Sequence, residues 1–397
     1  MKRIFCCATL MLALFATGCG DANQKTSVLP QIDMNADYPD KEICLQDVAD
    51  VSYIPLESKD DFLFRGKMEE VSSEGIAVIG DDKIYLFHPD GKARSVIDKK
   101  GQGPGEYPFV TYGIVDWKKE EVFVHLFSQN LIYVYSFSGD LKRQFKFEEK
   151  VVQHDFVDGG AGYLVMFKEK PGENKEGKVA PPYHPIVRMS KVDGRVDSLS
   201  YQQDYYTSMH LQMALADGTP YKVMMPSTSL KNLNGDVYVN EVSSDTVYRM
   251  VGEALEPVIT RTPSVKEDKE NKCFLMMYGL TPRHYFLRRQ MQRLVYNETN
   301  QKWDYECMDK GSGWLLYDIK TGEAFTPKFY NTDWQSDVSY KYLTFGGKDA
   351  NTAYLRIEAF DLIEALEAGE LSGELKTIAE GLKEDDNPVL MVVKFKE

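Results

Sequence analysis

The chain has 397 residues, and its 47 Lys and Arg residues against 61 Asp and Glu residues give a formal net charge of −14. An acidic surface repels nucleic acids and anionic lipid headgroups, so we expect no nucleic-acid partner. The length exceeds the roughly 250–300 residues at which one compact core stops growing, so we expect two domains or a ring of repeated units.

Residues 1–18 have the composition of a secretory signal peptide. Lys2 and Arg3 give a positive start, and residues 4–16 form an apolar run that is too short to span a bilayer. Small residues lie directly before Cys19, which resembles a bacterial lipobox and implies cleavage there and lipid attachment to Cys19. Loss of the two cations takes the formal charge from −14 to −16.

Residues 20–40 contain few apolar side chains and no sustained period. They predict a flexible tether with a root-mean-square reach of roughly 25 Å. The predicted organisation is therefore a signal peptide at 1–18, a lipidated Cys and tether at 19–40, and a folded body at 41–397.

From residue 51 onward one pattern recurs, in which an apolar and aromatic strand, a Gly, Asp or Asn turn and a second strand follow each other. Its clearest copies are residues 84–97 and 132–147. Four weaker copies, which make six in all, begin near Gly162, Asp236, Gly313 and Ala353. A four-stranded unit of roughly 40–50 residues is the size of a propeller blade. Because the spacing is irregular, two packed β-sandwiches are the competing architecture.

Two segments near the end need separate interpretations. Residues 281–291 fit either a helix that starts at Thr281 or a strand hairpin, and their aromatic residues favour the hairpin. Apolar spacings of three and four in residues 360–382 predict two short amphipathic helices. Residues 388–395 then predict a strand, which would close a ring by pairing with a strand from the start of the body.

The segment at 101–107 (GQGPGEY) has the glycine content of a phosphate-binding loop. Such a loop needs a helix after it, but Pro108 and a run of aromatic and β-branched residues follow, and Glu106 would repel a phosphate. We therefore interpret the segment as a turn between blades.

Each of these residue types has a structural use in a turn. Gly101, Gly103 and Gly105 allow positive φ and close backbone passage, and Pro104 restricts the chain between two of them. Tyr107 is expected to anchor the loop on the adjacent blade.

Three stretches, at 53–57 (YIPLE), 100–107 (KGQGPGEY) and 386–390 (DNPVL), are similar to motifs of the six-bladed β-propeller lipoproteins of Bacteroidetes, relatives of NHL-repeat propellers. The resemblance covers residues 41–397. It implies an all-β ring of six blades, an outer-membrane lipid anchor and an extracytoplasmic location, but no known activity. We also expect a monomer. Only one acidic residue, Asp21, directly follows Cys19, so the periplasmic and cell-surface faces both stay open.

Cys44, Cys273 and Cys307 are the cysteines of the folded body. An odd number excludes a complete disulfide framework. A Cys273–Cys307 bridge requires that neighbouring strands carry the two residues, and buried thiols are the alternative. The body has no CxxC motif, which argues against thioredoxin chemistry and zinc ribbons.

No motif for metal binding or nucleophilic catalysis is present, since the histidines occur singly and HExxH, DxDxDG and GxSxG are missing. We predict no cofactor, although dispersed carboxylates can hold an axial calcium, as they do in calcium-dependent lactonase propellers. A propeller hydrolase or lyase with an axial metal is thus the alternative function.

A basic cluster stands out in so acidic a chain and comprises Arg283, His284, Tyr285, Arg288, Arg289 and Arg293. It could line a funnel for an anionic sugar or a peptide carboxylate, or form one face of a solvated hairpin. Arg65 and Arg261 are weaker candidates for charges in the channel. The leading hypothesis is a non-catalytic module that binds a glycan, a peptide or a protein.

Overall fold

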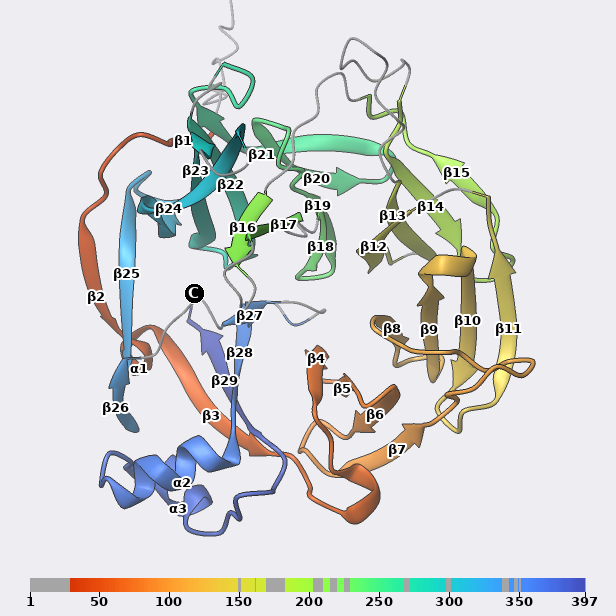
Figure 1. Ribbon diagram of the computed structural model, residues 1–397. Coiled ribbons are helices and arrows are strands. Elements are labelled where there is room, and N and C mark those ends of the chain that lie inside the picture. The colour runs from red at the N-terminus through yellow and green to blue at the C-terminus, as the bar shows by residue number, and fades with distance from the viewer. Residues whose placement is uncertain are drawn as a thin grey trace, which may run out of the picture.

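The computed structural model describes residues 29–148, 151–160, 162–168, 183–202, 210–214, 220–224, 229–267, 271–297, 301–337, 343–345, 349 and 351–396. Six sheets surround a central axis and form a six-bladed β-propeller (Figure 1). The main strands of each sheet pair antiparallel. The predicted fold class is confirmed.

The first three blades each have four strands in chain order from the centre outward. Blade 1 comprises β4 (Gly66–Ser72), β5 (Gly75–Gly80), β6 (Lys83–Phe87) and β7 (Ala93–Ile97). Blade 2 comprises β8 (Gly113–Asp116), β9 (Glu121–Leu126), β10 (Leu131–Ser136) and β11 (Leu141–Lys146). Blade 3 comprises β12 (Val151–Asp158), β13 (Tyr163–Lys168), β14 (Ile186–Ser190) and β15 (Val196–Ser198).

Blades 4 and 5 each gain an outer strand from the N-terminal part of the chain. Blade 4 comprises β18 (Leu230–Leu233), β19 (Asp236–Val239), β20 (Thr246–Val251), β21 (Ala254–Thr262) and β1 (Gln31–Asp33). Blade 5 comprises β22 (Asn271–Leu280), β23 (His284–Asn297), β24 (Lys302–Asp318), β25 (Ala324–Asn331) and β2 (Asp40–Cys44), with β26 (Trp334–Asp337) paired to β25. A hairpin of β16 (His210–Ala214) and β17 (Pro220–Met224) lies outside the blades.

Blade 6 closes the ring with strands from both ends of the chain, in the order β27 (Thr344–Phe345), β28 (Thr352–Ile357), β29 (Val389–Phe395) and β3 (Ala49–Pro55). β29 and β3 pair antiparallel along their whole length, from Val389 opposite Pro55 to Phe395 opposite Ala49. The predicted closure is confirmed, and it removes what would otherwise be two exposed sheet edges.

Helix is scarce, as predicted. The two C-terminal helices, α2 (Ala359–Glu367) and α3 (Gly373–Ala379), lie between β28 and β29 in the chain and pack on the core of blades 5 and 6 through Leu362 and Leu375. The other helical turns are α1 (Leu45–Val48), η1 (Asp60–Phe62) and η2 (Phe127–Gln129). Residues 284–291 lie in β23, so the hairpin interpretation of that segment is also confirmed.

The hydrophobic core is divided into clusters that lie between neighbouring blades. Tyr107 and Val115 belong to the cluster between blades 1 and 2, whereas Phe123 and Phe156 belong to the next one. Strands such as β9 and β5 are buried on both faces because a blade packs against a neighbour on each side. This packing explains why the strongest sequence copies read as nearly continuous apolar runs.

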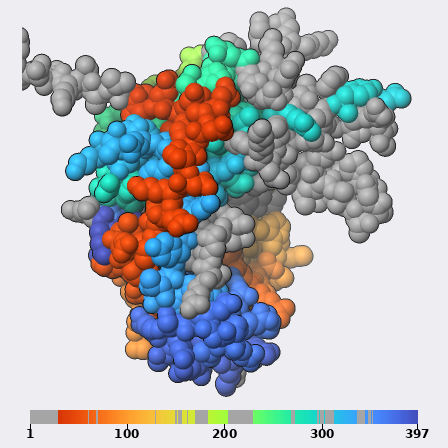
Figure 2. Space-filling model, turned by 90° about the vertical axis from the view of Figure 1, so that its left-hand side faces the viewer, coloured from red at the N-terminus to blue at the C-terminus, as the bar shows by residue number. Residues whose placement is uncertain are grey.

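The boundary predicted between tether and body was wrong, because the propeller begins before residue 41. β1 lies within the predicted tether and pairs parallel with β21, and Ile32 and Met34 are buried. Figure 2 shows the N-terminal segment, in red, crossing the outside of the light-blue strands of blade 5. A parallel pairing with a strand more than 200 residues away leaves no local pattern, and two isolated apolar residues were too weak a signal.

Candidate functional site

The segment at 101–107 connects β7 to β8 and therefore links blade 1 to blade 2. Tyr107 is fully buried, donates a hydrogen bond from its hydroxyl to the carbonyl oxygen of Ile97 (3.2 Å) and meets Tyr135 of blade 2 edge to face. Burial raises the pKa of Tyr107 to about 12. The expected anchoring role of Tyr107 agrees with these contacts.

The glycines of this turn differ in what they do. Gly105 has φ of +75°, while Gly101 and Gly103 do not have positive φ. A Cβ atom at Gly101 would collide with the carboxylate of Glu106, which accepts a hydrogen bond from the backbone N–H of Gly103 (2.8 Å). The Glu106 carboxylate thus stabilises the turn through this hydrogen bond. The expectation of positive φ was correct for Gly105 alone.

The residues of the predicted basic cluster do not converge. Arg283 and His284 meet at Asp318, at 3.0 and 3.8 Å, and burial lowers the pKa of His284. Tyr285 stacks on Tyr317, with the ring centroids 6.1 Å apart. Neighbouring residues of a strand point to opposite faces, which separates the members of the cluster.

Arg289, Arg261 and Arg65 lie at separate places in the fold. Arg289 donates to the carbonyl oxygens of Met34 and Ala36, at 3.3 and 2.6 Å. Arg261 is buried beside Asp245 of its own blade, and the exposed Arg65 precedes β4. These positions do not form the expected funnel.

The Cys273–Cys307 bridge also conflicts with the strand order. Cys273 lies opposite Met291 and Cys307 lies opposite Gln292, so β23 separates the two strands that carry the cysteines. Two strand spacings amount to about 9–10 Å, beyond the limit of about 7 Å between Cα atoms for a disulfide. Cys44 and Cys273 are buried thiols. Cys19 lies outside the described residues.

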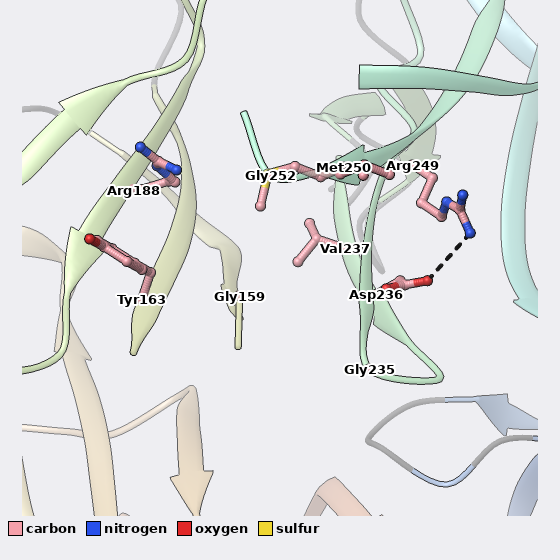
Figure 3. Close-up of a pocket in the computed structure, with 10 residues that line it drawn as sticks. Gly159, Tyr163, Arg188, Gly235, Asp236, Val237, Arg249, Met250 and Gly252 are labelled. Carbon is pink, nitrogen blue, oxygen red and sulfur yellow. Dashed lines mark ion pairs between the residues drawn. The ribbon is translucent and has the colours of Figure 1, made fainter. Parts of the chain in front are cut away.

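A slot of about 430 Å³ opens between blades 3 and 4, and sequence reasoning missed it. Figure 3 shows Tyr163 and Arg188 of blade 3 on one wall, opposite Val237 and Met250 of blade 4. Its lining also includes glycines of three turns, namely Gly159, Gly235 and Gly252. We call this cavity the slot.

The charged groups around the slot are paired. Arg188 lies over the ring of Tyr163 at 5.3 Å and pairs with Asp197 of its own blade (2.6 Å) and with Glu253 of blade 4 (2.7 Å). The hydrogen bond that Arg188 donates to Asp197 is the main cause of the raised pKa of Arg188. The Arg188–Glu253 pair therefore bridges the two blades that enclose the slot.

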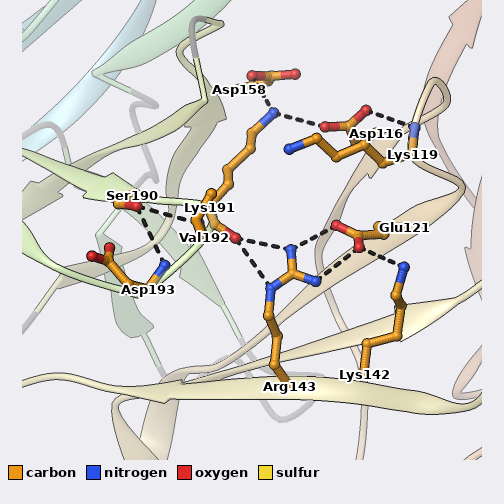
Figure 4. A network of polar contacts seen from close by, with 10 residues as sticks. All are labelled: Asp116, Lys119, Glu121, Lys142, Arg143, Asp158, Ser190, Lys191, Val192 and Asp193. Carbon is orange, nitrogen blue, oxygen red and sulfur yellow. Dashed lines mark hydrogen bonds and ion pairs between the residues drawn. The ribbon is translucent and has the colours of Figure 1, made fainter.

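A buried network of charges joins blades 2 and 3 on the other side (Figure 4). The ammonium of Lys191 lies 2.8 Å from Asp158 and 3.4 Å from Asp116, and all three residues are buried. Arg143 binds Glu121 through two hydrogen bonds, of 2.8 and 2.6 Å, which hold the pKa of that carboxyl at about 2. This network fixes one blade against the next.

The ends of the inner strands repeat one feature that the sequence analysis overlooked. In five blades a small polar side chain accepts a hydrogen bond from a backbone N–H of the turn that follows, at 2.8 to 3.3 Å; the acceptors are Ser72, Asp116, Asp158, Asn232 and Thr281. Ser, Thr, Asn and Asp favour such turns. A search for these residues after short aliphatic runs could have located the blades more accurately than the glycines did.

The described residues contain neither a metal-binding group nor a membrane-spanning helix. No group of three or more His, Cys, Asp or Glu side chains there is placed to hold a metal ion. No helix in this part of the chain is long and apolar enough to cross a membrane.

Solved structures of two Bacteroides proteins are similar to this chain over most of its length. A Bacteroides fragilis protein described as exported has a TM-score of 0.62 at 15% identity, over 93% of this chain and 100% of that one. A DUF4221 family member from Bacteroides vulgatus has a TM-score of 0.48 at 12% identity, over 88% and 97% of the two chains. A search of curated proteins found no match.

A family model covers nearly the whole propeller. It is described as a domain of unknown function, DUF4934, and it matches residues 29–394. Those bounds include β1 and end within β29, so they agree with the ring as the structure defines it. The chain belongs to the DUF4934 family.

Proposed function

We propose that this protein is a non-catalytic binding module of the cell envelope, tethered to the outer membrane through Cys19, that takes up part of a glycan in the slot between blades 3 and 4. The observation that carries the proposal is the slot itself, because blades 3 and 4 form its two walls and glycine turns line it. Pockets of several hundred cubic ångströms with an apolar lining and a few polar groups are the usual form of a small-ligand site.

The charges around the slot favour an uncharged ligand. Arg188 and Arg249 are outnumbered by four carboxylates that pair with them; these belong to Asp197, Glu253, Asp236 and Glu256. An anionic group would have to displace one of these partners. A sugar ring can instead lie against Tyr163 with its apolar face while its hydroxyls meet fixed donors and acceptors.

The preference for an uncharged ligand distinguishes this proposal from the hypothesis of a funnel that binds an anionic ligand. That hypothesis depended on a convergence of the basic residues of β23, and those residues occupy different faces. A peptide or protein partner is the alternative occupant of the slot.

The extracytoplasmic location is supported by the signal sequence with its lipobox-like end and by the similar fold of a protein described as exported. Metabolic feeding with labelled palmitate should label the wild-type protein but not a Cys19→Ala variant. An unlabelled wild-type protein would overturn the anchor.

Binding is tested with the full mature chain, purified in detergent, on a glycan array and a peptide library side by side. Tyr163→Ala and Arg188→Gln remove one wall of the slot, and we expect both to lose glycan binding. Arg94→Gln is the matched control, because Arg94 also lies over an aromatic ring (Phe137, 4.6 Å) and pairs with a carboxylate (Glu120, 2.5 Å), but it belongs to blade 1.

Three outcomes would contradict the proposal in different ways. Slot-dependent binding of peptides alone would replace the glycan by a peptide. Glycan binding that survives both slot variants would move the site elsewhere. A stoichiometric calcium or zinc found by elemental analysis of the purified protein would favour a hydrolase or lyase with an axial metal.

A further inference from the structure

The point at which the chain joins the ring is fixed on the outer edge of blade 4. The backbone N–H of Thr260 donates to the carbonyl oxygen of Pro30, and the N–H of Met34 donates to that of Thr262, both at 2.8 Å. Ile32 between them is fully buried. The propeller therefore holds the chain from Pro30 onward.

The next residues continue around the rim of the ring as a strap, which we define as residues 29–48. β1 adds to blade 4 and β2 adds to blade 5, both as parallel outer strands, before β3 enters blade 6. Arg289 of β23 binds the stretch between the first two strands, through the carbonyl oxygens of Met34 and Ala36, and lies over the ring of Tyr38 at 4.9 Å. These contacts resist peeling of the strap from the rim.

Chain length then limits how far a lipid on Cys19 can be from this edge. The twelve steps from Cys19 to Gln31 span at most about 43 Å when fully extended, and a flexible chain of that length has a root-mean-square span of about 19 Å. A compact body of this size has a radius of gyration of about 21 Å, which corresponds to a diameter of roughly 54 Å. The tether is thus short compared with the ring.

We propose that blade 4 faces the membrane and that blade 1, which lies opposite it in the ring of six, points away from the lipid surface. This inference rests on the proposed lipid anchor at Cys19. Because the tether leaves from the rim of one blade, the plane of the ring is perpendicular or tilted to the membrane. The distance of a blade from the bilayer then increases from blade 4 to blade 1.

The strap gives no electrostatic attraction to an anionic bilayer. It carries five acidic residues and one basic residue, namely Asp33, Asp37, Asp40, Glu42, Asp47 and Lys41. Acidic side chains are repelled by anionic headgroups. The tether alone therefore sets the orientation, and the ring without its lipid should not bind vesicles.

The orientation has a consequence for the slot. It lies between blades 3 and 4, so it is close to the membrane, while the turn at 101–107 between blades 1 and 2 is far from it. A ligand of the slot is then most accessible near the bilayer surface.

The test uses the lipidated full-length protein in phosphatidylethanolamine and phosphatidylglycerol vesicles that contain an acceptor dye on the headgroup. A donor dye is attached through an unnatural amino acid at Ala254 or at Lys92, two exposed positions, the first at the start of β21 in blade 4 and the second directly before β7 in blade 1. We expect energy transfer from position 254 to exceed that from position 92 by about twofold or more, given the short span of the tether.

The control inserts 24 Gly and Ser residues between Ala22 and Asn23, which should reduce the difference between the two positions because the longer tether no longer orders the blades. Equal transfer from both positions, or stronger transfer from position 92, would overturn the orientation. Failure of the wild-type protein to float with the vesicles would overturn the anchor itself, and the orientation with it.

Discussion

The side-chain amide of Asn387 donates a hydrogen bond to the carbonyl oxygen of Glu57, at 2.9 Å, across 330 residues of sequence. The same side chain also donates to the carbonyl oxygen of Phe62 and accepts from the N–H of Phe64. Two of the three sequence motifs, YIPLE and DNPVL, therefore meet in space at the closure of the ring. Because the two motifs lie so far apart in the chain, the sequence around either one does not show that it contacts the other.

Replacement of Asn387 by Ala should weaken the closure. It leaves three backbone groups of the segment at 57–64 without their partner, and unsatisfied buried groups cost about 1–3 kcal/mol each before relaxation and water entry. We expect a loss of about 2–4 kcal/mol in urea unfolding. Asp385→Ala, at an exposed position nearby, should lose less than about 1 kcal/mol, and equal effects of the two variants would show that Asn387 has no special role.

The buried ammonium of Lys191 should matter more than its exposed neighbour in the same network. Lys191→Met leaves Asp116 and Asp158 buried without their cation, which we expect to cost about 3–5 kcal/mol. Lys142→Met removes a partly exposed partner of Glu121 and should cost less than about 1 kcal/mol. Urea unfolding measures both, and adding Asp158→Asn to Lys191→Met should recover part of the loss.

Glu121 should make stability depend on pH. Its pKa is about 2 in the folded protein against an ordinary value of 4.5, chiefly because Arg143 donates to it. A lowered pKa gives stability that is fully present above about pH 4.5 and is lost as the pH falls towards 2, on the order of 2–3 kcal/mol. The difference in urea midpoint between wild type and Glu121→Gln should shrink from pH 7 to pH 3. A constant difference would mean that the Arg143 pair does not stabilise the fold.

Within the turn at 101–107, Gly105 and Gly103 should differ in how much stability is lost when a side chain is added. Gly105→Ala places a Cβ atom at positive φ and 3.0 Å from Leu141, so we expect a loss of about 1 kcal/mol or more. At Gly103 the nearest atom to an added Cβ is the flexible end of Glu106, at 3.1 Å, so Gly103→Ala should cost less, while the larger Gly103→Val should still destabilise the fold. Thermal unfolding ranks the variants, and a Gly103→Val protein that melts like the parent would contradict the structural account of the turn.

The repeated strands could be predicted because their cause is local. Residues 84–97 and 132–147 alternate or run apolar wherever a blade packs against its neighbours, and glycines mark turns that need positive φ, such as Gly91 and Gly139. The six copies found in the sequence fall on six different blades. The C-terminal helices followed from spacings of three and four on one face.

The candidate site could not be predicted in the same way. Tyr163, Arg188 and Met250 come from three strands of two blades, and nothing in their immediate sequence indicates that they line one slot. The basic cluster misled in the opposite direction, because residues such as Arg288 and Arg289 are neighbours in sequence but point to opposite faces of β23.

The sequence by itself determined the all-β class, the number of blades and the closing strand, because burial patterns and turn residues are set by interactions within about ten residues. Only the tertiary structure decided where the strap begins, which charges are buried together and which two blades form the slot. Those features depend on contacts such as Gln31 beside Thr260 and Lys191 beside Asp116, whose partners are brought together only when the ring has closed.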